Sequence, residues 1–242
     1  MKIILIKFYI VIWCMLPRIL FSQGEVNTME ITVRSTIDFA INGKGEALNW
    51  EKTEWYTIQV RSSGNIDMQT QLKCLYSRTG LYFLFKCEDQ LISATIETDF
   101  ADLWLEDVVE IFLWPDESYP VYFEYEISPL NRELVLLIPN LDGQFWGWRP
   151  WHYEQDRRVN HLTSAIGGEL KSGAVVDGWM AEIFIPYELL KPLTNVPPVS
   201  GSNWRANFYR CDYDNGQYNY WAWQPIEKRF HEFEKFGVLV FE

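Results

Sequence analysis

The residues best suited to chemistry in this chain are glutamates that stand among aromatic side chains. In VYFEYEIS (residues 121–128) Glu124 and Glu126 are two positions apart, and Glu110 stands in the similar run DVVEIFLW (residues 107–114). Because strand side chains alternate between faces, Glu124 and Glu126 would share one face. Paired carboxylates cleave glycosidic bonds in glycoside hydrolases, and carboxylates also accept hydrogen bonds from sugar hydroxyls. Both interpretations remain open at this level.

Trp104 ends the acidic loop ETDFADLW (residues 97–104) and precedes the segment that carries Glu110. The face of an aromatic ring suits the C–H face of a sugar, through dispersion and the removal of apolar area from water. A carboxylate such as Glu110 complements it by accepting two hydroxyls in charge-assisted hydrogen bonds. Trp104 and Glu110 are therefore candidate carbohydrate-binding residues. The alternatives are a core tryptophan and a structural charge that is paired within the fold.

Acidic residues are concentrated around the same loop: Asp89, Asp99, Asp102, Glu106 and Asp107. Carboxylate oxygens are the ligands that calcium prefers, which makes Asp99, Asp102, Glu106 and Asp107 candidate metal ligands. Their spacing matches no calcium loop of defined pattern, and runs of charge are most often solvated faces. Any calcium bound there would have a structural role.

The segment GQFWGWRPWHYE (residues 143–154) is dense in aromatic residues, among them Trp146, Trp148 and Trp151. A glycine and a proline interrupt it, which indicates a loop. Exposed aromatic patches mark interaction sites, so Trp146 and Trp148 are candidate contacts for a sugar. A long loop can also bury its own tryptophans as a satellite core. The sequence does not decide between the two.

Short segments rich in β-branched and aromatic residues dominate the chain and predict strands. They are residues 69–77, 80–89, 107–115, 121–128, 134–139, 179–186, 204–213, 218–225 and 237–242. Only YELL (residues 187–190), which lies between two prolines, indicates a helical turn. The pattern predicts an all-β fold, a single antiparallel β-sandwich of about eight to eleven strands.

Alternation along these segments separates an apolar face from a mixed one. Val109 and Ile111 would point to the core, whereas Glu110, Phe112 and Trp114 would point the other way. The mixed faces are either plain solvent faces or the lining of a concave binding sheet.

The first residues differ from the rest. MKIILIK is short and basic, FYIVIWCML is an apolar run too short to span a bilayer, and SQG offers small residues for cleavage. These features predict a cleaved signal peptide over residues 1–24, a binding domain over residues 25–242, and a secreted or periplasmic protein. A membrane anchor is the alternative. The residues before Cys14 lack the small side chains of a lipoprotein signal.

The formal net charge of −12 limits the possible partners. An acidic surface repels phosphate backbones, so we expect no nucleic acid partner, whereas neutral sugars are compatible with it. Cys74, Cys87 and Cys211 follow the signal segment, and their odd number leaves at least one free thiol. Cys74 and Cys87 would not face each other across the turn at residues 77–80, so we expect buried thiols rather than a disulfide.

Several segments follow one another in the order seen in family 9 carbohydrate-binding modules: LYFLFKCED, LWLEDVVEIFLWPDE, YFEYEISPLN, GWMAEIFIPYELL, WRANFYRCDY, WAWQP and FHEFEKFGVLVF. The sequence resembles this family, which is related to the DOMON-type β-sandwiches, over about residues 37–242. The resemblance implies a β-sandwich that binds sugars, often with structural calcium, and has no catalytic activity of its own.

In such modules two tryptophans hold a terminal sugar ring while polar side chains bind its hydroxyls. The resemblance places Trp104 on one of these tryptophans. It places Phe230 near the other, with His231 beside it as a further candidate contact.

The resemblance also assigns polar contacts. Glu110 and Asp89 fall on hydroxyl-binding carboxylates, and Asn207 and Tyr209 lie on the strand that supplies another polar contact. Glu124 stands where the family pattern has an arginine, so the preferred sugar can differ from the family's.

The predicted function is non-catalytic binding of an oligo- or polysaccharide. Expected partners are glycan-degrading enzymes or outer-surface proteins that act in polysaccharide catabolism. One alternative is a haem-binding redox module of the DOMON type, for which His161, His231, Met68 and Met180 are the available axial ligands. Others are glycoside hydrolysis by the paired carboxylates and a protein-interaction module that uses the loop tryptophans.

Overall fold

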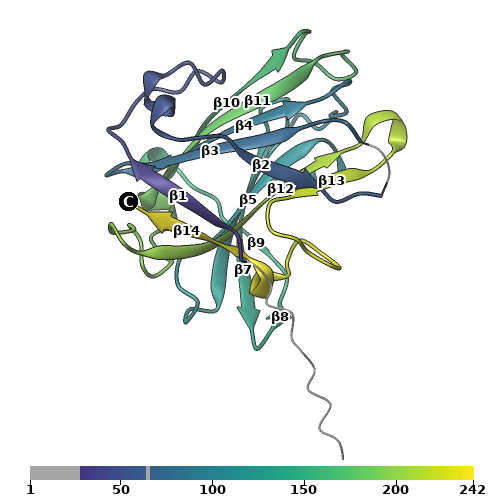
Figure 1. The fold of residues 1–242 in the computed structure, drawn as a ribbon. Helices are drawn as coiled ribbons and strands as arrows, with labels where there is room; N and C mark the ends of the chain where they lie inside the picture. The colour runs from purple at the N-terminus through teal and green to yellow at the C-terminus, as the bar shows by residue number, and fades with distance from the viewer. Residues whose placement is uncertain (1–27, 64–65) are drawn as a thin grey trace, which may run out of the picture.

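A computed structural model describes residues 28–63 and 66–242, so the predicted signal peptide (residues 1–24) lies outside the described residues. The described chain folds into two β-sheets that pack face to face (Figure 1). Within that part of the chain no helix is long and apolar enough to cross a membrane. The predicted all-β sandwich is confirmed.

The first sheet is antiparallel and has five main strands. Their order is β10 (Asn160–Ile166), β11 (Gly178–Pro186), β4 (Gly80–Glu88), β3 (Thr70–Tyr76) and β2 (Tyr56–Val60). Three of them coincide with predicted segments. Neither β2 nor β10 was among the segments predicted to form strands.

The second sheet is also antiparallel. Its order is β14 (Gly237–Phe241), β12 (Asn203–Asp212), β5 (Val108–Trp114), β6 (Val121–Ile127) and β7 (Glu133–Leu141). Strand β13 (Asn219–Ala222) pairs with the end of β12, and two short strands, β8 (Gln144–Phe145) and β9 (Arg149–Pro150), pair with β7. The aromatic segment at residues 143–154 is thus partly paired, where the sequence indicated a loop.

Two strands join the sheets. β1 (Glu30–Ser35) pairs in parallel with β14 through its first residues and with β3 through its last two, and β2 pairs with both β3 and β13. The parallel pairs of β1 depart from the predicted antiparallel pattern. Apart from the predicted turn α1 (Tyr187–Leu190), the helical elements are short 3-10 turns: η1 (Leu48–Lys52), η2 (Leu103–Leu105), η3 (Gln155–Arg157), η4 (Asp214–Gly216) and η5 (Phe233–Lys235).

The main core lies between the two sheets. Val109 and Ile111 of β5 pack there with Phe83 and Phe85 of β4, as the predicted alternation requires. The three thiols are buried and unpaired, and burial raises the pKa of Cys87 to about 12. The prediction of buried thiols rather than a disulfide is confirmed.

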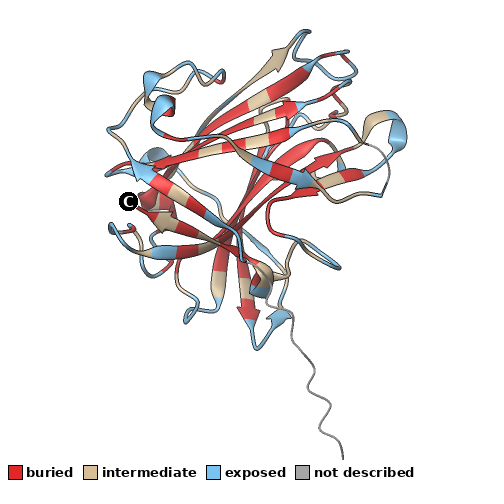
Figure 2. Cartoon of the chain, in the orientation of Figure 1, coloured by how far each residue is buried: buried red, intermediate tan, exposed pale blue. Residues whose placement is uncertain are grey.

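Buried residues lie along the strands of both sheets (Figure 2), and part of each outer face is covered as well. On the second sheet, Phe112 and Tyr122 pack under Phe233 and Phe236 of the C-terminal segment. On the first sheet, Tyr82 lies in a cluster with Trp50 of η1. The mixed face of the second sheet is therefore neither bare to solvent nor wholly closed, and its uncovered part forms the site described next.

Candidate functional site

A pocket of about 410 Å³ opens on the outer face of the second sheet, beside the C-terminal segment. Its floor consists of Glu110 from β5 and of Glu124 and Glu126 from β6. Alternation explains the grouping: Glu124 and Glu126 share a face of β6, and Glu110 is the cross-strand partner of Glu126. The three glutamates singled out in the sequence thus meet in one place.

All three floor glutamates are buried, yet few groups of the chain donate hydrogen bonds to them. One carboxylate oxygen of Glu124 and one of Glu126 (Oε2 in each) have no hydrogen-bond partner. Glu110 is reached by the Cys211 thiol, with 3.8 Å between Sγ and Oε1. Buried polar atoms are nearly always paired in native proteins, so these free oxygens point to a ligand that donates hydrogen bonds.

Burial makes the charged form of these side chains costly. It raises the pKa of Glu124 to about 8, and it raises the pKa values of Glu110 and Glu126 well above their usual range, with added repulsion between neighbouring carboxylates. Near neutral pH these carboxyls are therefore mainly protonated. The floor can both donate hydrogen bonds to sugar hydroxyls and accept them.

Aromatic side chains in mutual contact surround this floor. We call them the aromatic rim: Phe145, Trp148, Trp104, Tyr213, Tyr218, Tyr220, Phe230 and His231. On one side, the ring centroids of Trp104 and Trp148 are 5.6 Å apart. Phe145 connects Trp148 to His231, with centroid distances of 6.3 and 4.1 Å.

The other side of the rim runs through tyrosines. The Tyr213 hydroxyl donates to the carbonyl of Trp104 at 2.8 Å, and the Tyr213 ring lies 5.0 Å from that of Tyr218. Centroid distances of 5.9 Å from Tyr218 to Tyr220 and 5.7 Å from Tyr220 to Phe230 complete this side. Apart from Phe145, all members of the rim line the pocket. Rings around a carboxylate floor can hold the apolar face of a sugar while its hydroxyls meet the glutamates.

His231 is fixed in the rim by its neighbours. A hydrogen bond of 2.7 Å joins its Nδ1 to the Tyr122 hydroxyl, and the same nitrogen is 3.8 Å from Glu124 Oε2. Burial lowers the pKa of His231 to about 4, so the imidazole is neutral near pH 7. It therefore brings no positive charge to the floor.

The structure brings five of the predicted carbohydrate-binding residues to the pocket. They are Trp104, Glu110, Trp148, Phe230 and His231. Trp104 is half-buried, whereas Trp148 is 45 % exposed.

Three other predicted contacts do not line the pocket. Asp89 is buried, accepts a hydrogen bond from the Trp179 indole and forms an ion pair of 3.0 Å with Arg210. The side-chain amide of Asn207 donates to the Tyr209 hydroxyl, which in turn donates to the carbonyl of Phe230 at 2.7 Å. Their polar atoms are used within the fold, so Asp89 has a structural role, and Asn207 with Tyr209 positions the rim.

The tryptophans of the segment 143–154 differ in exposure and in contacts. Trp146 is 65 % exposed and does not line the pocket, although it was a predicted contact. Trp151 is half-buried against the main core, and its indole N–H donates to the Leu189 carbonyl at 3.1 Å. Only Trp148 of the three reaches the candidate site, so the segment is part rim and part satellite core.

Sequence reasoning missed the tyrosines of the rim. Tyr218 and Tyr220 are two positions apart in YNYWAW, so alternation along β13 and the residues before it could have indicated a shared face. Tyr213 ends the predicted strand of residues 204–213 and continues the alternation of Asn207 and Tyr209, so the same pattern could have indicated it, although β12 itself ends at Asp212.

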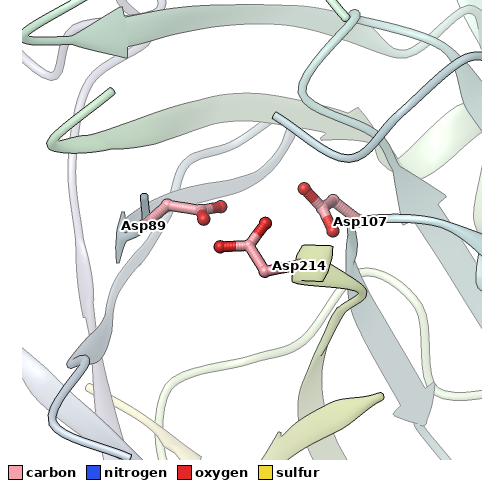
Figure 3. A group of neighbouring side chains, drawn as sticks. All are labelled: Asp89, Asp107 and Asp214. Atoms are coloured by element: carbon pink, nitrogen blue, oxygen red, sulfur yellow. The ribbon is translucent and has the colours of Figure 1, made fainter. Parts of the chain in front are cut away.

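A second acidic group, whose members do not line the pocket, bears on the calcium prediction (Figure 3). Carboxylate oxygens of Asp89, Asp107 and Asp214 lie within 4.8 Å of one another and point toward a common centre. Burial raises the pKa of Asp89 to about 6 and that of Asp107 to about 8, with neighbouring carboxylates adding to the effect. A hard divalent cation fits such a set of oxygens and would relieve this repulsion.

The other predicted metal ligands lie outside this group. Glu106 accepts hydrogen bonds from the backbone of Thr95 and Ile96, and Asp99 accepts one from the backbone of Glu133. Asp102 is exposed. Of the four candidates, Asp107 alone is in the group.

The two histidines named as available haem ligands are not brought together. His231 lines the pocket on the second sheet, whereas His161 lies in a separate pocket formed in part by β10. His161 Nδ1 is hydrogen-bonded to Asn131 Oδ1, and its Nε2 lies 3.4 Å from Glu133 Oε2.

Comparison with known proteins agrees with this architecture. Residues 41–134 match the family described as "Carbohydrate family 9 binding domain-like". The chain has the fold of the family 9 carbohydrate-binding modules. The predicted resemblance is thereby confirmed.

Solved structures resemble this chain in fold, and a curated protein resembles it in sequence. A family 9 module from Caldicellulosiruptor kristjanssonii, solved with cellotriose and with glucose, aligns with a TM-score of 0.63 at 16 % identity, over 88 % of this chain and 94 % or 96 % of that one. A protein of Bacteroides uniformis ATCC 8492 for which carbohydrate binding has been proposed aligns with a TM-score of 0.69 at 18 % identity, over 89 % of this chain and all of the other. An "Extracellular protein" of Arthroderma benhamiae is 25 % identical over 183 residues, which are 72 % of this chain and 78 % of that protein.

Proposed function

We propose that this protein binds a saccharide, without cleaving it, in the pocket enclosed by the aromatic rim. The observation that carries the proposal is a floor of three buried glutamates with two unpartnered oxygens inside a ring of aromatic side chains. Sugars combine apolar C–H faces with many hydroxyl donors, which is the combination that this surface complements. The family 9 modules with the same fold, solved with cellotriose and glucose, support it.

Each part of the pocket has a role in this proposal. Trp104 and Trp148 stack on a sugar ring from one side, and Phe230 closes the other side. Glu110, Glu124 and Glu126 bind hydroxyls at the floor. An apolar pocket with a few convergent polar groups fixes orientation through those groups, so the glutamates set specificity and the rings supply most of the affinity.

The proposed setting is outside the cell, with binding in support of enzymes or surface proteins that degrade glycans. The predicted signal peptide and the extracellular relative support this setting. The cluster of Asp89, Asp107 and Asp214 is the proposed calcium site, with a structural role. Hydrolysis remains the second candidate, because carboxylates are paired in the pocket, and labelled oligosaccharides incubated with the protein test it directly.

Calorimetry and affinity electrophoresis across a panel of glycans test the binding proposal. We expect saturable binding of at least one oligosaccharide, and a loss of about tenfold or more in affinity for Trp104→Ala. The absence of binding to every glycan, for a folded sample supplied with calcium, would contradict the proposal.

A further inference from the structure

The buried carboxylates of this chain differ in what the chain itself supplies to them. Glu182 accepts four N–H donors, and Asp89 shares Arg210 with Asp212. Asp107 accepts the backbone N–H groups of Ser93 and Tyr213. The fold thus provides donors or a cation for these four buried carboxylates.

The floor of the pocket differs from these carboxylates. No lysine or arginine of the described residues forms an ion pair with Glu110, Glu124 or Glu126, and the single basic group in reach, His231, is neutral near pH 7. Two of the carboxylate oxygens have no donor at all. Three acidic groups therefore face one cavity without a counter-charge from the chain.

The surroundings of these groups also suit a cation. Aromatic faces attract ammonium groups through their quadrupole, and the aromatic rim presents such rings around the floor. Lys228 and Arg229 also line the pocket, but both are exposed, so salt screens their repulsion more than it screens charges at the buried floor. The pocket therefore has acidic groups at its depth and basic groups only at its outer edge.

We infer that the pocket selects a sugar that carries a free amino group, and that its ammonium binds the carboxylates of Glu110, Glu124 and Glu126. The inference rests on the proposed function and names the class of sugar. An ammonium offers three donors to the unpartnered oxygens, and its positive charge takes the place of a proton held by the floor carboxyls. A neutral sugar satisfies only the hydrogen bonds, and a uronic acid would bring a further carboxyl to a floor that already holds three.

Three β-1,4-linked oligosaccharides of equal length provide a matched test, because they differ only at C2: glucosamine, N-acetylglucosamine and glucose. Calorimetry is carried out at mildly acidic pH, where the amine is protonated, and at physiological salt, which weakens unspecific attraction to the acidic protein. We expect the glucosamine oligomer to bind about tenfold more tightly than the glucose oligomer. Equal or weaker binding of the glucosamine oligomer overturns the inference.

Variants of the floor glutamates test whether these residues cause the preference for the glucosamine oligomer. Glu124→Gln and Glu126→Gln keep the shape of the side chains, and we expect each to remove most of the preference for glucosamine while the glucose oligomer loses less. The exposed Glu169→Gln is the matched control, and we expect it to keep the preference. A preference that survives both floor variants belongs to the acidic surface and overturns the inference.

Proton release gives a readout that needs no variant. An ammonium lowers the pKa of the carboxyls that bind it, so binding of the glucosamine oligomer expels protons, and calorimetry in buffers of different ionisation enthalpy measures them. No proton release on binding overturns the inference. Binding of the glucose or acetylated oligomer alone leaves the proposed function intact and refutes only the amino-sugar preference. If neither these three oligomers nor any other glycan binds, the proposed function itself is refuted.

Discussion

Glu182 shows how one buried side chain positions a whole segment. Its Oε2 accepts the backbone N–H groups of Asn42, Gly43 and Gly45, and its Oε1 accepts the Trp50 indole at 2.8 Å. Gly45 has a φ of +67°, and a Cβ there would lie 2.4 Å from a methyl group of Leu84. Contacts with Glu182 of β11 and Leu84 of β4 therefore explain the glycines of INGKG (residues 41–45). These residues belong to the segment that covers the first sheet.

Glu182→Gln should therefore destabilise the fold without touching the pocket. An amide turns an NH₂ group toward N–H donors, so we expect a loss of about 2–3 kcal/mol in the free energy of unfolding. Denaturant titration measures it, with Glu169→Gln, expected within about 0.5 kcal/mol of the native chain, as the control. A titration curve for Glu182→Gln that coincides with that of the native chain would show that Glu182 does not hold the segment.

Glu124 should make stability depend on pH. Its pKa in the folded protein is raised to about 8 by burial, above the value of about 4.3 in an unfolded chain. The folded state then binds more protons between these values, so this group's contribution to stability is present at low pH and is lost as the pH rises toward 8. We expect Glu124→Gln to flatten the fall in unfolding free energy between about pH 5 and pH 8.

Denaturant titration at several pH values measures this effect. Part of the slope should persist in the variant, because the pKa of Asp107 is also raised to about 8. If unfolding free energy falls with pH equally steeply in the native chain and in Glu124→Gln, Glu124 is not a buried carboxyl with a raised pKa.

The segment of residues 143–154 divides into parts with different roles. Trp148→Ala should reduce sugar affinity about tenfold and change stability little, because Trp148 is 45 % exposed and contacts Trp104 at the pocket. Trp151→Ala should have the opposite effect, with a loss of roughly 2–3 kcal/mol in stability, because its ring packs on the core and its indole is bonded to Leu189. Calorimetry and thermal unfolding separate the two effects.

Trp146→Ala is the comparison within the same segment. Its side chain lies outside the pocket, so we expect binding and stability close to those of the native chain. If Trp148→Ala lost stability and kept its affinity, the whole segment would be a satellite core and the rim would end at Trp104.

The strands that the sequence predicted are those with a clear local signal. Alternation in β5 and β6 placed Glu110 and Glu124 on the mixed face, and the structure has them there. β10 lacked such a signal, because NHLTSAI is an edge strand with only partly buried side chains. The parallel pairing of β1 depends on contacts with β14, some 200 residues away, which no local pattern contains.

The site was predictable only in part, for the same reason. Trp104 and Glu110 carried both a local signal and a family resemblance. Asp89 carried the resemblance, but its partner Arg210 lies on β12, and pairing across more than a hundred residues cannot be read from spacing. Trp148 reaches the pocket only because β8 and β9 fold the segment back on β7.

At the scale of the whole molecule, segments of both sheets come together at three carboxylates. Asp89 follows β4 of the first sheet, whereas Asp107 precedes β5 and Asp214 follows β12 of the second (Figure 3). A cation among these carboxylates would join the sheets and offset the repulsion between them. Its effect would therefore appear in the unfolding of the entire domain rather than in one loop.

Calcium should accordingly raise the unfolding temperature of the domain relative to a sample treated with chelator. At a calcium concentration about a hundredfold above its dissociation constant the stabilisation is about 2.7 kcal/mol, which corresponds to roughly 5–10 °C for a chain of this size. Differential scanning calorimetry with calcium, with magnesium and with chelator measures it. Asp214→Asn should remove most of the calcium effect, whereas Asp102→Asn, an exposed change outside the group, should keep it. Equal unfolding temperatures with calcium and with chelator would mean that Arg210 and the backbone donors already satisfy these carboxylates, and that no cation joins the sheets there.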